Sequence, residues 1–314
     1  MDKDTNTNLG VGAVMAVLSI VFVGMRFYVR HLKKAGFKWD DWLILTCLLT
    51  MIAADILAIC ALVGNPSSPE AATLENDTFE YTPADVKYTK LSYIATVLYF
   101  TIASTMKMSI LLMYNRLFSV SKSFRHQVVA LFGLVISFWV GCTIANLLNC
   151  IPIKYTWINS LADPEYCINY NIYWFASGII ETFIDVLIII LPIRMVIGLQ
   201  FNWHQKVAVA SVFLFGAFVI VSGLLKAILG YVPGSREPSF IRTQLWTTVH
   251  CGTGIICACL PVCWPLISHF GKFVPKRWSR ITSFQRLRDS FNSGSIEREE
   301  EVLEHRGGFH REEN

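Results

Sequence analysis

The sequence predicts an all-α fold: a polytopic membrane protein whose seven transmembrane helices form one bundle. Hydrophobic residues make up 54% of its 314 residues, and charged residues only 16%, whereas an ordinary soluble domain is about 25% charged. The mean hydropathy is +0.47. Many of the charges lie in one terminal stretch, Ser268 to Asn314. Too few remain to cover a soluble surface, which excludes a soluble domain, a secreted disulfide scaffold, a disordered chain and a nucleic-acid binder. The lipid bilayer is therefore the predicted partner.

Seven apolar runs are long enough to cross the hydrocarbon core as helices. They are Leu9–Tyr28, Asp41–Val63, Leu91–Met113, Gln127–Asn149, Asn171–Pro192, Gln205–Tyr231 and Gln244–Ser268. The first follows Asp2-Lys3-Asp4, which is not a positive flank, and no cleavage-like site precedes Arg26. We therefore expect a retained span and not a signal peptide.

Lysine and arginine in the connections predict the orientation, because cytosolic loops carry an excess of them. The first, third and fifth connections and the tail are richer than the second, fourth and sixth connections. The richer connections contain Arg30, Lys33, Lys34, Lys38, Arg116, Lys122, Arg125, Arg194 and Lys206. The N-terminus is expected outside and the C-terminus in the cytosol, with the plasma membrane as the expected location.

Three regions follow: a short extracellular N-terminus (1–8), the seven-helix domain (9–268) and a cytosolic tail (269–314). Apolar residues at helical spacing, with arginine and lysine between them, predict an amphipathic basic helix over 276–291 on the inner leaflet. A disordered basic tail is the alternative. The end of the chain is acidic and expected to be mobile.

The predicted outer loops contain two candidate modification sites. Asn76-Asp77-Thr78 matches the N-glycosylation pattern. Cys150 and Cys167 share the fourth connection, and an oxidising compartment would favour a disulfide between them. Two unpaired thiols are the alternative.

Several local patterns in order resemble the fungal rhodopsin-domain integral membrane proteins. They are Arg26-Phe27-Tyr28-Val29-Arg30, then Asp40-Asp41-Trp42, Lys107-Met108-Ser109, Tyr114-Asn115-Arg116, Cys150-Ile151-Pro152, Leu191-Pro192 and Trp264-Pro265-Leu266. The resemblance implies a seven-helix protein of a filamentous fungus, in a family with receptor-like members and members of secondary-metabolite clusters. It implies no known reaction.

No cofactor, metal or enzymatic activity is expected. A retinal protein needs a lysine in its last helix for the Schiff base, and none lies between Arg242 and Lys272. Cysteines in the last span lack metal-binding spacing, and no hydrolase motif occurs.

Ionisable residues inside the spans are the candidate functional residues, because they are costly in hydrocarbon. By depth they form an inner cluster (Arg26, Lys107, Asp185) and a group near mid-membrane or in the outer half (Asp55, Glu181, Lys226, His250). We expect Lys107 to pair with Asp185, and Lys226 with Glu181 or Asp55.

These charges have three interpretations. They could be structural pairs, or line an ion path. They could also surround an outward-facing ligand cavity lined by Tyr93, Asp55, Glu181, Lys226 and His250. The sequence thus predicts a receptor-like protein that senses a small molecule and contacts a cytosolic partner such as a G protein. The alternative is an accessory, scaffold or permeability protein of a metabolite pathway.

Overall fold

The structure, a computed structural model, describes residues 3–34, 36–64, 83–117, 122–158, 165–197, 203–236 and 238–273. Within these ranges the regular elements are helices, apart from one isolated antiparallel bridge between Cys150 and Cys167. The helices are α1 (Lys3–Leu32), α2 (Trp39–Gly64), α4 (Pro83–Leu117), α5 (Lys122–Leu147), α6 (Tyr155–Ile158), α7 (Tyr170–Ile197), α8 (Trp203–Gly230) and α9 (Phe240–Phe273).

Seven of these helices, all except the short α6, are long and apolar enough to cross a membrane. The predicted all-α, seven-span architecture is thereby confirmed, while the orientation of the termini stays a prediction. The helices extend beyond the apolar runs: α1 begins at Lys3 and not Leu9, and α4 begins at Pro83 and not Leu91. Polar residues continue both helices, so hydropathy alone places their starts too late.

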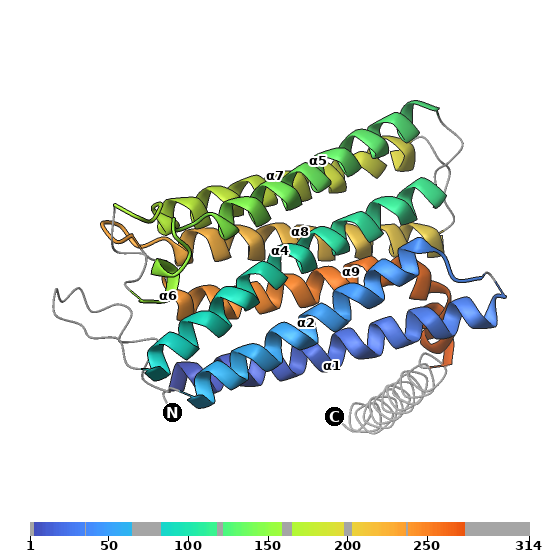
Figure 1. The fold of residues 1–314 in the computed structure, drawn as a ribbon. Helices are drawn as coiled ribbons and strands as arrows, with labels where there is room; N and C mark the ends of the chain where they lie inside the picture. The colour runs from blue at the N-terminus through green and yellow to red at the C-terminus, as the bar shows by residue number, and fades with distance from the viewer. Residues whose placement is uncertain are drawn as a thin grey trace, which may run out of the picture. The chain divides into compact units, whose positions relative to one another are not determined.

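Internal contacts divide the chain into two units, Met1–Cys263 and Trp264–Asn314. Within the first unit the long helices run alternately up and down (Figure 1). One end of this bundle carries the start of α1, α4, α7 and α9, together with α6 and the Cys150–Cys167 pair. We call it the disulfide end, and the other the opposite end.

Small residues let the helices approach closely where the polar side chains meet. A Cβ atom on Gly254 of α9 would lie 2.0 Å from Met106 Sδ of α4, and one on Gly178 of α7 would lie 2.9 Å from the Ala227 Cβ of α8. A larger residue at Gly178 would press on the Ala227 Cβ and backbone and push α7 and α8 apart, whereas one at Gly254 would displace the Met106 side chain.

The distribution of side chains is that of a protein in lipid. Leu214, Val129 and Val17 are 72%, 64% and 60% exposed, whereas Lys107 and Lys226 are fully buried. In water an apolar rim around a charged interior would be unstable, but lipid chains cover the rim at no cost. The predicted membrane protein is confirmed.

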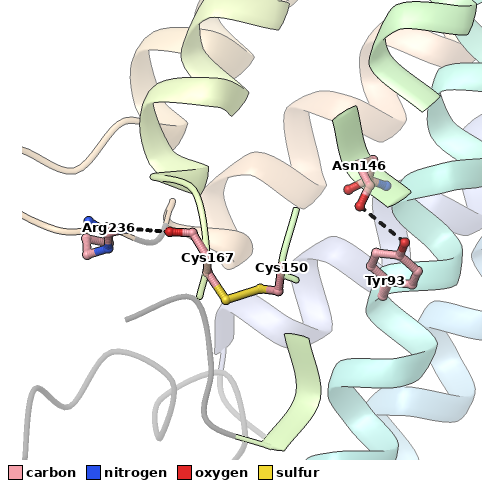
Figure 2. Close-up of a disulfide and its surroundings, with 5 residues drawn as sticks. All are labelled: Tyr93, Asn146, Cys150, Cys167 and Arg236. Carbon is pink, nitrogen blue, oxygen red and sulfur yellow. Dashed lines mark hydrogen bonds between the residues drawn. A yellow bond between two sulfur atoms is a disulfide. The ribbon is translucent and has the colours of Figure 1, made fainter. Parts of the chain in front are cut away.

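A covalent link holds the loop between α5 and α7. The expected disulfide between Cys150 and Cys167 is present, with the two Sγ atoms 2.06 Å apart (Figure 2). Arg236, from the connection between α8 and α9, donates to the Cys167 carbonyl at 2.8 Å. The disulfide loop is therefore fastened to a second loop at the same end.

Two predictions concern residues outside the described ranges and stay predictions. They are the glycosylation site at Asn76 and the amphipathic helix over 276–291.

Candidate functional site

Glu181 of α7 is the centre of a buried cluster that joins four helices. Its Oε2 atom lies 2.6 Å from Lys226 Nζ of α8, and its Oε1 atom lies 3.2 Å from Lys107 Nζ of α4. The Tyr99 hydroxyl, also on α4, donates to Oε2 and accepts a hydrogen bond from Lys226 Nζ. Glu181 itself is 2% exposed, so its charge is balanced by side chains and not by water.

Asp185 and His250 complete this group, which we call the Glu181 cluster (Tyr99, Lys107, Glu181, Asp185, Lys226, His250). Asp185 follows Glu181 by one helical turn and lies 3.0 Å from Lys107 Nζ through Oδ1. His250 Nε2 of α9 lies 3.4 Å from Glu181 Oε1 and 3.9 Å from Asp185 Oδ2. With a neutral histidine, the two lysines and two carboxylates balance.

His250 is held from its other side by α8. Its Nδ1 atom lies 3.1 Å from the Val219 carbonyl and 3.4 Å from Ser222 Oγ. A Cβ on Gly223 would meet the imidazole ring at 3.2 Å. The ring therefore has a fixed position between α8 and the carboxylates of α7.

Two expected ion pairs are present, Lys107 with Asp185 and Lys226 with Glu181. The expected separation into two layers is not, because Lys107 reaches both carboxylates and joins the pairs into one cluster. Sequence reasoning missed Tyr99. The helical spacing could have identified it, because Tyr99 precedes Lys107 by eight residues, about two turns along one helix face.

A cavity of about 140 Å³ lies next to the cluster, towards the disulfide end. Its lining includes Asp55, Tyr88, Tyr99, Tyr170, Trp174 and Thr247, from α2, α4, α7 and α9. Tyr99 thus belongs to both structures: its ring lines the cavity and its hydroxyl is bonded within the Glu181 cluster.

The lining of this cavity differs from the expected one. Asp55 lines it, but Glu181, Lys226 and His250 lie behind its wall, because their polar atoms face one another. Tyr93 points elsewhere: its hydroxyl donates to the Asn146 carbonyl of α5 at 3.2 Å (Figure 2).

Arg26 belongs to a second, separate group at the opposite end, and not with Lys107 and Asp185 as expected. We call it the Arg26 cluster (Arg26, Arg30, Asp40, Asp41). Arg26 Nη2 lies 2.7 Å from Asp40 Oδ2, and its Nε lies 2.8 Å from Asp41 Oδ1. Its Nη1 donates to the Ala258 carbonyl of α9 at 2.7 Å. One guanidinium thus ties α1 to the start of α2 and to α9.

The motif Asp40-Asp41-Trp42 receives a physical role from this arrangement. Arg30 contacts both aspartates, at 2.5 Å and 3.2 Å, while Asp41 Oδ2 accepts the Lys38 backbone N–H at 3.1 Å and caps α2. The two tryptophans that flank the aspartates point outward: Trp39 is 80% exposed and Trp42 53%. The aspartates hold the helix start, and the tryptophans face the surroundings.

The residues of the Glu181 cluster do not fit a metal ion well. Single ligand atoms of Glu181, Asp185 and His250 lie within 4.8 Å of one another. Lys107 Nζ, however, lies 3.2 Å and 3.0 Å from the two carboxylates and already supplies the positive charge that a metal would bring.

Fold and site together define a seven-helix membrane protein with a buried charge cluster next to a cavity. Comparison with known families shows to which family of membrane proteins the chain belongs. The model of the fungal rhodopsin domain matches residues 25–269, and the chain belongs to this family. The resemblance predicted from local motifs is confirmed.

Named relatives fall into two groups. The chain is similar to "Polyenoic acids biosynthesis gene cluster protein Ba17b" of Metarhizium anisopliae, 29% identical over 82% of this chain and 73% of that protein. It is also similar to "Receptor GIN3" of Arthrobotrys oligospora, 27% identical over 90% of this chain and 67% of that protein. "Wortmanamides biosynthesis cluster protein C" of Talaromyces wortmannii is 25% identical over 86% and 71%. No solved structure matches.

Proposed function

We propose that this protein is a non-enzymatic receptor of a filamentous fungus that senses a small extracellular ligand in the cavity beside Tyr99. It would lie in the plasma membrane with the disulfide end outside, as the positive loops predict. The cavity would then open towards the medium, and the Arg26 cluster would face the cytosol.

The observation that carries the proposal is the double role of Tyr99. Its ring lines the cavity, and its hydroxyl is bonded to both Glu181 and Lys226. A ligand that displaces this ring changes hydrogen bonds on which α4, α7, α8 and α9 converge. Sites couple when one element has two arrangements that both sites bias, and Tyr99 is the element that we propose for this role.

The signal would continue along α9 to the cytosolic side. His250 contacts the Glu181 cluster, and Ala258, on the same helix, accepts the hydrogen bond from Arg26. A movement of α9 would therefore reach the Arg26 cluster. A cytosolic partner such as a G protein is proposed from this architecture and from the similarity to a protein named a receptor.

The test separates binding from response in cells that express the chain. Small-molecule fractions of fungal culture medium are applied, and cyclic AMP and calcium are recorded. Ala95→Phe fills the cavity and should abolish binding and response together. Tyr99→Phe keeps the ring and removes the hydroxyl, so binding should survive while the response falls at least about tenfold, as expected for loss of a charge-assisted hydrogen bond.

Tyr173→Phe is the matched control, because its hydroxyl donates to the Cys142 carbonyl at 2.9 Å, away from the cavity and the cluster. It should leave both readouts unchanged. A full response from Ala95→Phe at normal expression would disprove the proposal.

Relatives named as biosynthesis cluster proteins favour a second candidate, an accessory, scaffold or permeability protein of a metabolite pathway. Deletion would then alter export of the metabolite without changing cyclic AMP or calcium, which is the opposite of the receptor outcome.

A further inference from the structure

We propose that the ligand of the cavity is a small organic cation carrying a hydroxyl or carbonyl group, with Asp55 as its counter-ion. The inference rests on the proposed function, since it names the ligand class of the same cavity.

Charge is the first argument. Among the described residues that line the cavity, Asp55 is the only one with a formal charge, and its buried Oδ2 atom has no hydrogen-bond partner in the described part of the chain. The Asp55 side chain is half-buried, and its Oδ2 atom is the buried part. A carboxylate oxygen that is buried without a partner is costly, whereas pairing it with a cation recovers part of that cost. The cavity therefore lacks a positive charge that a ligand can supply.

The neighbouring lysines do not serve this purpose. Lys226 Nζ lies 4.4 Å from the centre of the Tyr99 ring, behind the cavity wall, but it is paired with Glu181 at 2.6 Å. Lys107 is shared by Glu181 and Asp185. The Glu181 cluster is balanced within itself, so the charge of Asp55 is left over.

Aromatic rings form the second argument. Tyr88, Tyr99, Tyr170 and Trp174 contribute to the lining. The negative faces of such rings attract ammonium groups, and aromatic residues grouped around a cation are a recurring mode of recognition.

Unpartnered polar atoms of the protein indicate the polar group of the ligand. Trp174, Thr243 and Thr247 line the cavity. Their polar atoms Trp174 Nε1, Thr243 Oγ1 and Thr247 Oγ1 are buried and have no hydrogen-bond partner among the described residues. Trp174 and Thr243 are 7% and 6% exposed. An indole N–H only donates, so a ligand oxygen is the group that satisfies it. Asp55 is on α2, whereas these atoms are on α7 and α9, so the two ends of one ligand are recognised by different helices.

Volume limits the size. Ligand pockets for drug-sized molecules measure roughly 300–1,000 Å³, and this cavity measures about 140 Å³. The ligand is therefore smaller, on the scale of one ring with a short polar arm.

Three isosteric probes test the charge: 2-amino-1-phenylethanol (an ammonium at neutral pH), 1-phenylethane-1,2-diol (neutral) and mandelate (an anion). All share the phenyl ring and the hydroxyl. Binding is measured by saturation-transfer NMR on the full chain in nanodiscs, with competition titrations giving Kd. The cation should bind roughly 10- to 100-fold more tightly than the diol, as expected for a charge-assisted hydrogen bond, and mandelate more weakly still.

Variants separate the two ends of the ligand. Asp55→Asn should remove the preference for the cation and leave the diol unchanged. Trp174→Phe should weaken the cation and the diol by a similar factor. Tyr173→Phe is the control, because its hydroxyl donates to the Cys142 carbonyl at 2.9 Å outside the cavity, and it should change nothing. Should Asp55→Asn fail to fold, Ala58→Lys places an ammonium one turn away on the same face and should also abolish the preference.

Equal binding of the cation and the diol, unchanged preference in Asp55→Asn, or no binding of the cation would each overturn the inference. None of these outcomes touches the proposed function, which is judged by Ala95→Phe and Tyr99→Phe with culture-derived ligands. Loss of the response in those variants together with stronger binding of the diol or mandelate would leave a receptor with a different ligand class.

Discussion

The two buried charge clusters use the same chemistry for different purposes. The ion pairs of the Arg26 cluster join residues close in sequence, since Arg26 and Asp41 are 15 positions apart, and only a backbone contact reaches α9, at Ala258. The cluster is built from rigid guanidinium forks and a capped helix start. The Glu181 cluster connects residues up to 127 positions apart and uses lysines, a tyrosine and a histidine. The first is suited to fixing one geometry, and the second to rearranging beside a cavity.

The largest expected effect comes from Arg26→Met. Breaking a buried pair leaves uncompensated charge and costs about 3–5 kcal/mol. Here Arg30 alone would face both Asp40 and Asp41, so one negative charge would lack a counter-ion. The variant should be poorly expressed and melt at much lower temperature in detergent. Lys33→Met is the control, because Lys33 is exposed just after the end of α1, and this variant should melt as the parent does. A parent-like Tm for Arg26→Met would remove the structural role of this cluster.

The disulfide should matter for the cavity end alone. Replacing Cys150 and Cys167 with serine opens a loop of sequence separation 17, which is worth about 3 kcal/mol in a chain-entropy account. Hydrogen exchange should accelerate over 149–158 and 165–172 and stay unchanged over 26–42. Equal acceleration at both ends would show that the bundle responds as one body and that its two ends are not stabilised independently.

Glu181→Gln should cost about 3 kcal/mol, the lower end of the range for a broken buried pair, because Lys107 keeps Asp185 and Lys226 keeps the Tyr99 hydroxyl but loses its counter-ion. The variant should fold but give no cellular response. Adding Lys226→Met removes the cation left unpaired and should recover part of the lost stability, so a double-mutant cycle measures the coupling. Additive losses would argue against a shared cluster.

The smallest effect is expected at Ser109, whose hydroxyl donates to the Asp40 carbonyl at 2.7 Å. Ser109→Ala removes one hydrogen bond between α4 and α2 and should cost about 0.5–1.5 kcal/mol. The thermal unfolding midpoint should shift by a few degrees without loss of response. A lost response would mean that the contact between α4 and the start of α2 also carries the signal.

Hydropathy and charge sufficed to predict seven spans, because crossing a membrane dictates the length and composition of each helix. They also identified the buried charges, since each is costly in hydrocarbon. Partner choice was harder. Arg26 was grouped by depth with Lys107 and Asp185, but its actual acceptors, Asp40 and Asp41, lie at the start of the second span and were not counted among the intramembrane charges.

The cavity could not be predicted from the same signals. Its lining depends on the rotation of each helix, which directs Asp55 into the space and the Tyr93 hydroxyl towards α5. Rotation follows from close packing at small residues such as Gly178 and Gly254, and hydropathy does not report it. The apolar pattern is weak on these helices because lipid and protein interior are both apolar.

The outward tryptophans beside Asp40 and Asp41 carry one more consequence. Indole rings anchor at the boundary between headgroups and acyl chains, so Trp39 and Trp42 set the level at which α2 enters the bilayer. The same helix start is fixed to Arg26, so a change in bilayer thickness would pull on the charge pairs directly. Thermal stability should therefore depend on acyl-chain length in nanodiscs, and Trp39→Ala with Trp42→Ala should flatten that dependence.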